Sequence, residues 1–184
     1  MPSASRVSVR PVRAEDFDDL RETYYRLYDE RDAGEPIGIT LFGTRPSLED
    51  EKAWLENALR RVDEGEVIFL VAEVGGHVVG SCTVGRLGPG AKSEQSHVGE
   101  LGILVRQGMR GKGIGSALLR RALEEARSRF TVIYLSVFSI NQGAQRLYQR
   151  FGFTHCGHLP RMVKRGGQYL DEERMVLVFP DRPA

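Results

Sequence analysis

The sequence of 184 residues predicts an α/β fold in which helices pack on the faces of a mixed β-sheet. Three features support this prediction. Two β-rich runs within residues 67–87 are joined by Gly75-Gly76, a strong hairpin signal. Residues 98–138 change from strand-like to helical periodicity and back, and a second hairpin is expected at Gly166-Gly167. Hairpins combined with strand–helix–strand units indicate a sheet with antiparallel and parallel neighbours.

The N-terminal elements follow from apolar spacing and from local caps. Residues 7–12 are strand-like, and residues 14–28 carry acidic side chains first and then apolar ones at helical spacing. Residues 29–46 are rich in glycine, proline and acid, so we expect a loop or a broken helix. Ser47 with Asp50 forms a capping box that predicts a helix over residues 48–62.

The C-terminal elements alternate more regularly. The pattern predicts a strand over 97–105, an amphipathic helix over 113–128, a strand over 131–138, a short helix over 141–151 and two strands within 153–178. The complete expected order is β-α-α-β-β-β-α-β-α-β-β, which corresponds to about seven strands and about four helices.

Composition narrows the possible classes of protein. Lysine and arginine (26) nearly balance aspartate and glutamate (25), so no overall field favours nucleic acid or an anionic membrane. No signal-like apolar segment is present, and apolar runs such as 67–72 are too short to span a bilayer. Cys82 and Cys156 lack zinc or redox spacing, and we expect both to be buried reduced thiols. We therefore expect one cytoplasmic domain over residues 1–184, ordered over about 7–179, without metal, nucleic acid or membrane partners.

Four glycines fall within residues 108–115, between a predicted strand and a predicted helix. A helix start offers free N–H groups and a partial positive charge, and glycines let phosphate oxygens approach the backbone. The stretch therefore resembles a pyrophosphate site. A Walker A loop is excluded because Gly113 follows Lys112, and the spacing of Gly111, Gly113 and Gly115 does not fit the dinucleotide fingerprint. A glycine-rich turn without a ligand is the alternative.

Two motifs together point to a family. Residues 110–115 match R-x-x-G-x-G, and "NQGAQRLYQRFGF" (141–153) matches N-x-x-A-x-x-L-Y-x-x-x-G-F at every fixed position. Read alone, the second motif is also compatible with a core helix. Together they resemble the GNAT superfamily of acetyl-CoA-dependent N-acetyltransferases, at motif strength over residues 98–153. This resemblance implies a central sheet that splays at the strand before the glycine loop.

The resemblance also implies how acetyl-CoA would bind. The pantetheine arm would pair with exposed backbone of the splayed strand, and the pyrophosphate would rest on the glycine loop. Asn141 would hydrogen-bond the pantetheine, and Ala144 would leave room for it. The implied cofactor residues are Ile103, Leu104, Val105, Arg110, Gly111, Lys112, Gly113, Ile114, Gly115, Ser116, Asn141, Ala144 and Tyr148.

The implied reaction is direct attack of a primary amine on the thioester in a ternary complex. Tyr148 matches the family's general acid, which protonates the departing thiolate. An amine with a pKa of about 10.4 must first lose a proton. Glu100 is the candidate base, with an ordered water chain as the alternative. Ser136 stands where relatives that act on ribosomal-protein N-termini often carry glutamate. His97, His155 and His158 are expected to lie at the surface or rim.

Acceptor residues are expected in two variable segments. The segment 28–46 contributes Glu30, and Tyr25 lies just before it on the predicted first helix. The final hairpin contributes Tyr169 and Asp171, while Arg161, Lys164 and Arg165 are expected to be solvated. Three functions remain open at this stage: acetylation of a small-molecule or peptide amine, acetylation of a protein N-terminus, and a non-catalytic acyl-CoA sensor. The acceptor, the use of longer acyl-CoAs and a homodimer also remain open.

Overall fold

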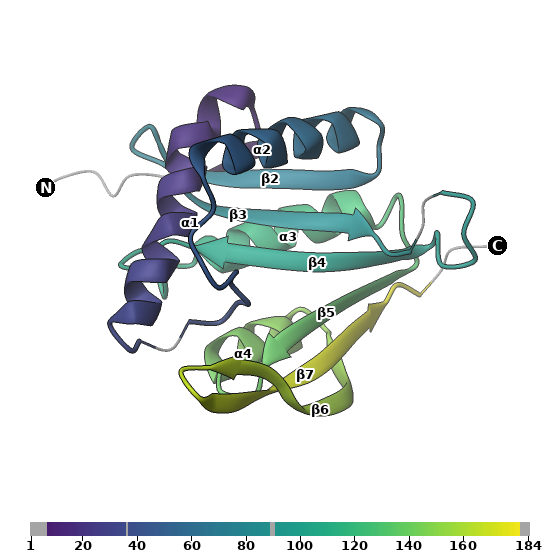
Figure 1. Ribbon diagram of the computed structural model, residues 1–184. Coiled ribbons are helices and arrows are strands. Elements are labelled where there is room, and N and C mark those ends of the chain that lie inside the picture. Colours follow the sequence, from purple (N-terminus) through teal and green to yellow (C-terminus); the bar gives the residue numbers. More distant parts are fainter. Residues whose placement is uncertain (1–6, 36, 89–90, 181–184) are drawn as a thin grey trace, which may run out of the picture.

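The computed structural model describes residues 7–35, 37–88 and 91–180; both chain ends and Pro36 of the expected loop lie outside this range. The order of elements confirms the expected one (Figure 1). The elements are β1 (Ser8–Pro11), a 3₁₀ turn η1 (Ala14–Asp16), α1 (Phe17–Asp32), α2 (Leu48–Asp63), β2 (Val67–Val74), β3 (His77–Arg86), β4 (Val98–Val105), α3 (Ile114–Ala126), β5 (Val132–Phe138), α4 (Gln142–Arg150), β6 (Thr154–Arg165) and β7 (Gln168–Val178).

The described strands form one sheet of seven in the order β1-β2-β3-β4-β5-β7-β6. All neighbours are antiparallel except β4 and β5, which run parallel. This parallel pair is short: it comprises Val98 with Val132, Gly99 with Ile133 and Glu100 with Tyr134. Beyond Glu100 the two strands diverge (Figure 1), so the edge of β4 that faces β5 has no strand partner from Leu101 onward. The expected splayed sheet is confirmed.

Helices cover both faces of the sheet, with α1 and α2 on one face and α3 and α4 on the other (Figure 1). The side chains of β2 show the division. Val67, Phe69 and Val71 pack toward α1 and α2, while Ile68 and Leu70 pack toward α3. This strand therefore reads as a continuous apolar run because both of its faces are buried.

The first helix differs from its predicted bounds at both ends. Asp16 accepts hydrogen bonds from Arg10 and from the Arg13 N–H, which fixes a 3₁₀ turn before α1 begins. The helix then continues past Tyr28 to Asp32. Tyr28 is only 1 % exposed and Glu30 only 4 %, so the last turn is held by packing that apolar spacing alone did not reveal.

The expectation for the cysteines is half correct. Both thiols are free, and Cys82 on β3 is buried, which raises its pKa to about 12. Cys156 is exposed instead, because it lies on β6, the edge strand of the sheet, whose side chains are largely accessible.

Candidate active site

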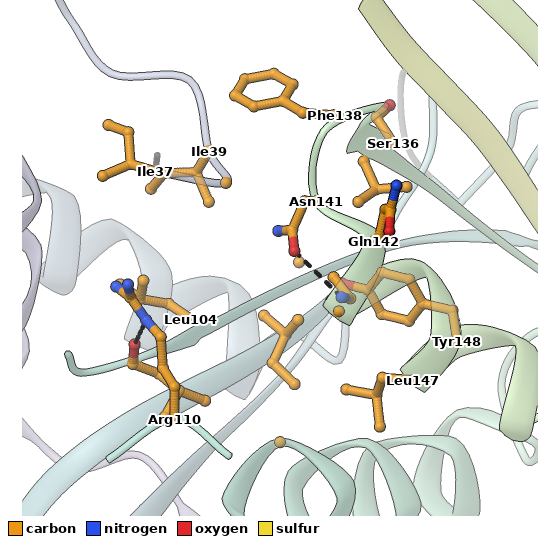
Figure 2. A pocket seen from close by; sticks show the side chains of 18 of the residues that line it. Ile37, Ile39, Leu104, Arg110, Ser136, Phe138, Asn141, Gln142, Leu147 and Tyr148 are labelled. Atoms are coloured by element: carbon orange, nitrogen blue, oxygen red, sulfur yellow. Dashed lines mark hydrogen bonds between the residues drawn. The ribbon is translucent and has the colours of Figure 1, made fainter. Parts of the chain in front are cut away.

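A cavity of about 870 Å³ occupies the opening between β4 and β5. Its walls come from the loop after α1, from β4, from the start of α3, from the end of β5 and from α4. Figure 2 shows Ile37 and Ile39 facing Asn141 and Tyr148 across this space. The lining includes residues 37–40, 101–105, 136–138 and 140–144, together with Leu27, Arg110, Gly111, Gly113, Gly115, Ser116, Leu147, Tyr148, Arg150 and Glu172.

The glycine loop (residues 108–115) presents bare backbone to this cavity. Gly113 is the N-cap of α3 and has φ +83°, a left-handed conformation that favours glycine. A Cβ built on Gly113 would meet no atom within 4 Å, so the space above it is open. The first intrahelical bond of α3 runs from the Ala117 N–H to the Gly113 carbonyl, at 3.0 Å. The N–H groups before Ala117 therefore point out of the helix start, where they suit a phosphate.

The two cations of the loop are used differently. Arg110 donates to both carboxylate oxygens of Glu30, at 2.8 and 3.1 Å, and to the Val105 carbonyl at 2.9 Å. Its charge is thus committed to a carboxylate that is 3 % exposed, and the pair fastens the end of α1 to the loop. Lys112 is exposed. The Ile114 side chain is buried in the core, so only its backbone faces the loop.

Asn141 and Ala144 open the helix α4 beside the cavity. Asn141 is the N-cap, and its Oδ1 accepts the Ala144 N–H at 3.2 Å (Figure 2). Its amide nitrogen packs against the loop after α1: a Cβ added to Gly38 would lie 2.2 Å from the Asn141 Nδ2. Only glycine at position 38 permits this approach of the loop to α4.

Tyr148 lines the same cavity from α4, and Figure 2 shows its ring directed into it. The side chain is 5 % exposed and packs against the Phe153 ring, with centroids 5.8 Å apart. Burial raises the pKa of Tyr148 well above its ordinary value, and the nearby Cys82 adds to the shift. The hydroxyl is therefore protonated at neutral pH and is available as a donor.

Glu100 lies outside this lining. It is exposed on β4, between Gly85 of β3 and Tyr134 of β5, at the last pair before the two strands diverge. The three histidines named from the sequence are exposed as expected. His158 is held by Glu173, and this hydrogen bond raises its pKa.

The four expected acceptor residues do not form one site: Tyr25 and Glu30 line a separate pocket beside α1, whereas Tyr169 and Asp171 lie on β7. Glu30 is bound by Arg110, and the Tyr25 hydroxyl donates to the Pro46 carbonyl at 2.7 Å. Tyr169 is 46 % exposed and stacks on Arg161, 3.9 Å from the ring centroid. Asp171 accepts the Arg161 N–H at 2.7 Å, where Arg161 has φ +60° within an irregular part of β6. Each of these side chains holds local structure, and none of them lines the cavity.

The structure identifies residues that sequence reasoning missed. Arg165 was expected to be solvated, which is wrong: it donates to the Ile37 carbonyl at 3.0 Å and to the Ile39 carbonyl at 2.7 Å. Burial is the main cause that lowers its pKa. Arg165 thus ties the loop after α1 to the β6–β7 hairpin. The signal that was available is Ile-Gly-Ile at 37–39, an apolar triplet in a polar loop.

Neither a metal site nor a membrane span is found in the part of the chain that the structure describes. There, no three side chains of histidine, cysteine, aspartate or glutamate come together as metal ligands. Within the same residues, no helix is long and apolar enough to cross a bilayer.

The structure thus combines a splayed mixed sheet with free backbone N–H groups at the start of α3, an arrangement that suits a phosphate-bearing ligand. The model of the Acetyltransferase (GNAT) family matches residues 6–153, and the chain belongs to this family. It is an N-acetyltransferase that uses acetyl-CoA, as the resemblance in its motifs implied.

Curated relatives match over most of their length. The chain is 28 % identical to the L-amino acid N-acetyltransferase AaaT of Escherichia coli (strain K12), over 95 % of this chain and 99 % of that one. It is 30 % identical to the L-methionine sulfoximine/L-methionine sulfone acetyltransferase of Pseudomonas aeruginosa, over 77 % and 80 %. Among solved structures, the ribosomal-protein-alanine N-acetyltransferase of Brucella melitensis superimposes with a TM-score of 0.79 at 31 % identity, over 94 % and 99 %.

Proposed function

We propose that the enzyme acetylates the primary amine of a small molecule of the amino-acid class, by direct attack within a ternary complex. Two observations support this function. The cavity between β4 and β5 continues past the glycine loop to residues 37–40 and to Glu172, which leaves room for an acceptor beside the donor. The curated relatives named above act on L-amino acids and on methionine derivatives. A third relative, 29 % identical, is the phosphinothricin N-acetyltransferase of Streptomyces coelicolor.

The donor would lie along the unpaired edge of β4. Residues 103–105 line the cavity, and their backbone groups that face β5 have no strand partner, so they would pair with the pantetheine amides. The amides of Gly111–Ser116 would hold the pyrophosphate, with exposed Lys112 adding charge nearby. Arg110 would shape the loop through Glu30 rather than bind phosphate itself. Asn141 and Ala144 would flank the arm from α4.

The chemistry then needs three groups. A neutral amine attacks the thioester carbonyl, and a backbone N–H of residues 103–105 would stabilise the oxyanion. As the C–S bond breaks, the Tyr148 hydroxyl would donate a proton to the sulfur. Holding both reactants in one cleft would supply much of the acceleration. No step requires a covalent acyl-enzyme, which is why we propose a ternary complex.

A protein N-terminus is the second candidate acceptor. The Brucella melitensis structure, whose name specifies a ribosomal-protein alanine, favours it through 31 % identity over nearly the whole chain. Ser136 argues for the small-molecule acceptor, because relatives of the N-terminal type often carry glutamate there. The third function expected from the sequence, a non-catalytic sensor, is disfavoured by named relatives that are enzymes. Cytoplasmic location, one domain and a possible partner copy remain predictions.

An acceptor screen tests this function. The enzyme is incubated with acetyl-CoA and with single amines, and free thiol release is recorded. The panel contains free amino acids, their sulfoximine and phosphinic analogues, polyamines, and peptides that begin with alanine. We expect turnover with free amino acids or their analogues and much less with peptides. Turnover with peptides alone would indicate that the enzyme acetylates protein N-termini. No turnover with any amine would overturn the proposed function.

A further inference from the structure

One acidic side chain lines the cavity and was not identified from the sequence. Among the lining residues that the structure describes, Glu172 is the single carboxylate. It lies on β7, and its side chain is 12 % exposed. A carboxylate that is largely shielded from water is costly unless a charged or hydrogen-bonding partner lies beside it.

Strand register places Glu172 beside the end of β5. Glu172 pairs with Phe138, and Arg174 pairs with Ser136. Side chains at these positions share one face of the sheet, and both Ser136 and Phe138 line the cavity. Figure 2 shows these two residues at the cavity wall, above Asn141. Glu172 therefore reaches the cleft from the strand next to Ser136, the position where relatives of the N-terminal type often carry a glutamate.

Arg174 holds Glu172 in place. An Arg174 Nη2 lies 3.2 Å from the Glu172 Oε2, while Nη1 donates to the Ser136 hydroxyl and to the Tyr134 hydroxyl. The guanidinium is thus shared among three partners and does not engage both carboxylate oxygens through two short bonds. This arrangement fixes the position of Glu172 and leaves carboxylate lone pairs for a further donor.

The two other candidate carboxylates are placed differently. Glu100 is exposed and absent from the cavity lining. Glu173 follows Glu172 in the chain, so its side chain projects from the opposite face of the sheet. There it accepts the Ser139 hydroxyl at 2.7 Å and bonds to His158 at 2.9 Å. Only Glu172 combines access to the cavity with shielding from water.

On the basis of the proposed function, we propose that Glu172 binds the acceptor ammonium and removes its proton. The step is a simple proton transfer: R–NH₃⁺ and the Glu172 carboxylate become R–NH₂ and the Glu172 carboxylic acid. The amine nitrogen then bonds to the thioester carbon and the C–S bond breaks. The departing sulfur takes a proton from Tyr148, and the second proton that the nitrogen loses on forming the amide restores the Tyr148 hydroxyl. Glu172 returns its proton to solvent, so each turnover releases one proton overall.

The surroundings of Glu172 suit this role. Burial raises the pKa of its carboxyl, which makes it a stronger base than an exposed glutamate. The charged or titratable groups on the elements around it are Arg174 on its own strand, Tyr134 on β5, and Arg165 of β6, which stacks 5.3 Å from the centre of the Phe138 ring. The same cavity is also lined by Tyr148 and Arg150 of α4 and by Arg110 of the glycine loop, whose charge is paired with Glu30. Beyond Tyr134 lies Glu100 on β4. Segment 37–40 adds no charge.

The test compares Glu172→Gln with Glu173→Gln and Glu100→Gln in the thiol-release assay, on the best acceptor of the wild-type enzyme, from about pH 6.5 to pH 9.5. Glutamine retains the shape of the side chain, and its amide oxygen can still lie beside the Arg174 guanidinium. We expect Glu172→Gln to lower kcat/KM about 10²-fold at pH 7, within the usual range for a general base. The deficit should shrink as pH rises, because the variant depends on amine that is already neutral. Acetyl-CoA affinity should be unchanged.

Matched results decide between the alternatives. Full activity in Glu172→Gln, or a loss that is the same at every pH, would overturn the proposal, as would the predicted profile appearing in Glu100→Gln instead. If Glu172→Gln does not fold, Glu172→Asp replaces it: the proposal expects reduced kcat with the wild-type pH profile, and a changed profile would contradict it. The wild-type enzyme tests the proposed function separately. If it acetylates no amine, both proposals fail, whereas a failure confined to the variants removes only the role of Glu172.

Discussion

The proposed phosphate end of the cleft is formed by the backbone of one short segment, Gly111–Ser116, at the start of α3. The proposed acceptor side is formed by residues from segments far apart in the chain: residues 37–40, Ser136 and Phe138 of β5, and Glu172 of β7. A site made of contiguous backbone requires glycines at fixed spacing, and this spacing is visible in the sequence as a motif. A site made of side chains from distant segments requires only that the fold bring them together, so no sequence motif marks it.

Tyr148 lies between these two regions, and its removal should have the largest effect. Tyr148→Phe retains the ring that packs on Phe153 and deletes the hydroxyl alone. We expect kcat to fall by about 10²–10⁴-fold, the usual contribution of a general acid, with little change in acetyl-CoA affinity or melting temperature. Steady-state kinetics measures kcat, and calorimetry measures the acetyl-CoA affinity and the melting temperature. A variant with full kcat on its acceptor would show that Tyr148 only packs.

The pH dependence of the wild-type enzyme sharpens this prediction. Because burial raises the pKa of Tyr148, the hydroxyl keeps its proton well into the alkaline range. Deprotonation of Tyr148 would remove the general acid and lower kcat, but we expect no such fall in kcat below about pH 10, the ordinary pKa of tyrosine. A decline of kcat that begins near pH 8, present in the wild type and absent from Tyr148→Phe, would contradict the raised pKa of Tyr148.

Gly38 joins the two regions through Asn141. Gly38→Ala would place a methyl group 2.2 Å from the Asn141 Nδ2, so either the loop or the amide must move. Overpacking of this kind costs about 1–3 kcal/mol, and we expect the KM for acetyl-CoA to rise about tenfold. Gly43→Ala is the matched control, since a Cβ there meets nothing within 4 Å in the same loop. Equal kinetic constants for the two variants would show that the contact between Gly38 and Asn141 does not affect acetyl-CoA binding.

Arg165 belongs to the acceptor side alone, and its effect should be smaller. Arg165→Gln removes the charge-assisted bonds to the carbonyls of Ile37 and Ile39. We expect the KM for the acceptor to rise about three- to tenfold while acetyl-CoA affinity stays constant, because the loop would still be anchored through α1. Lys164→Gln, on the exposed side of the same hairpin, serves as the control. A larger change in acetyl-CoA affinity than in the KM for the acceptor would contradict the proposed division of the cleft into a donor side and an acceptor side.

The sequence was most informative where structure depends on local patterns. The hairpin glycines, the Ser47 cap and the alternating periods predicted every strand and α-helix of the described chain in order, but not the 3₁₀ turn before α1. The glycine loop and the Asn141–Tyr148 motif indicated which segments line the cavity. The roles of single residues within those motifs were harder to predict: Arg110 matched a motif position, yet its charge is used by Glu30.

The residues of the acceptor side could not be predicted from the sequence, because they are brought together by the pairing of strands that are distant in the chain. Glu172 and Ser136 are far apart in the sequence and meet only because β7 inserts between β5 and β6. Arg165 looked like an ordinary hairpin cation until the loop after α1 was placed against it. Glu100, by contrast, was chosen from its position on a strand, and strand position alone did not reveal that its side chain is exposed outside the cavity.

Calorimetric titration of acetyl-CoA into a pair of glycine variants tests the central claim, that the backbone of the glycine loop holds the donor. Gly113→Asp places an anion at the N-cap of α3, inside the cavity lining. Gly108→Asp introduces the same side chain at the same kind of left-handed position in the same loop, but outside that lining. At position 113 the new carboxylate would block the approach of the pyrophosphate sterically, and it would also compete with the pyrophosphate for the positive end of the α3 dipole. We predict at least about tenfold weaker binding for Gly113→Asp and near wild-type binding for Gly108→Asp, with both proteins folded. Equal affinities for the two variants and the wild type would contradict the account.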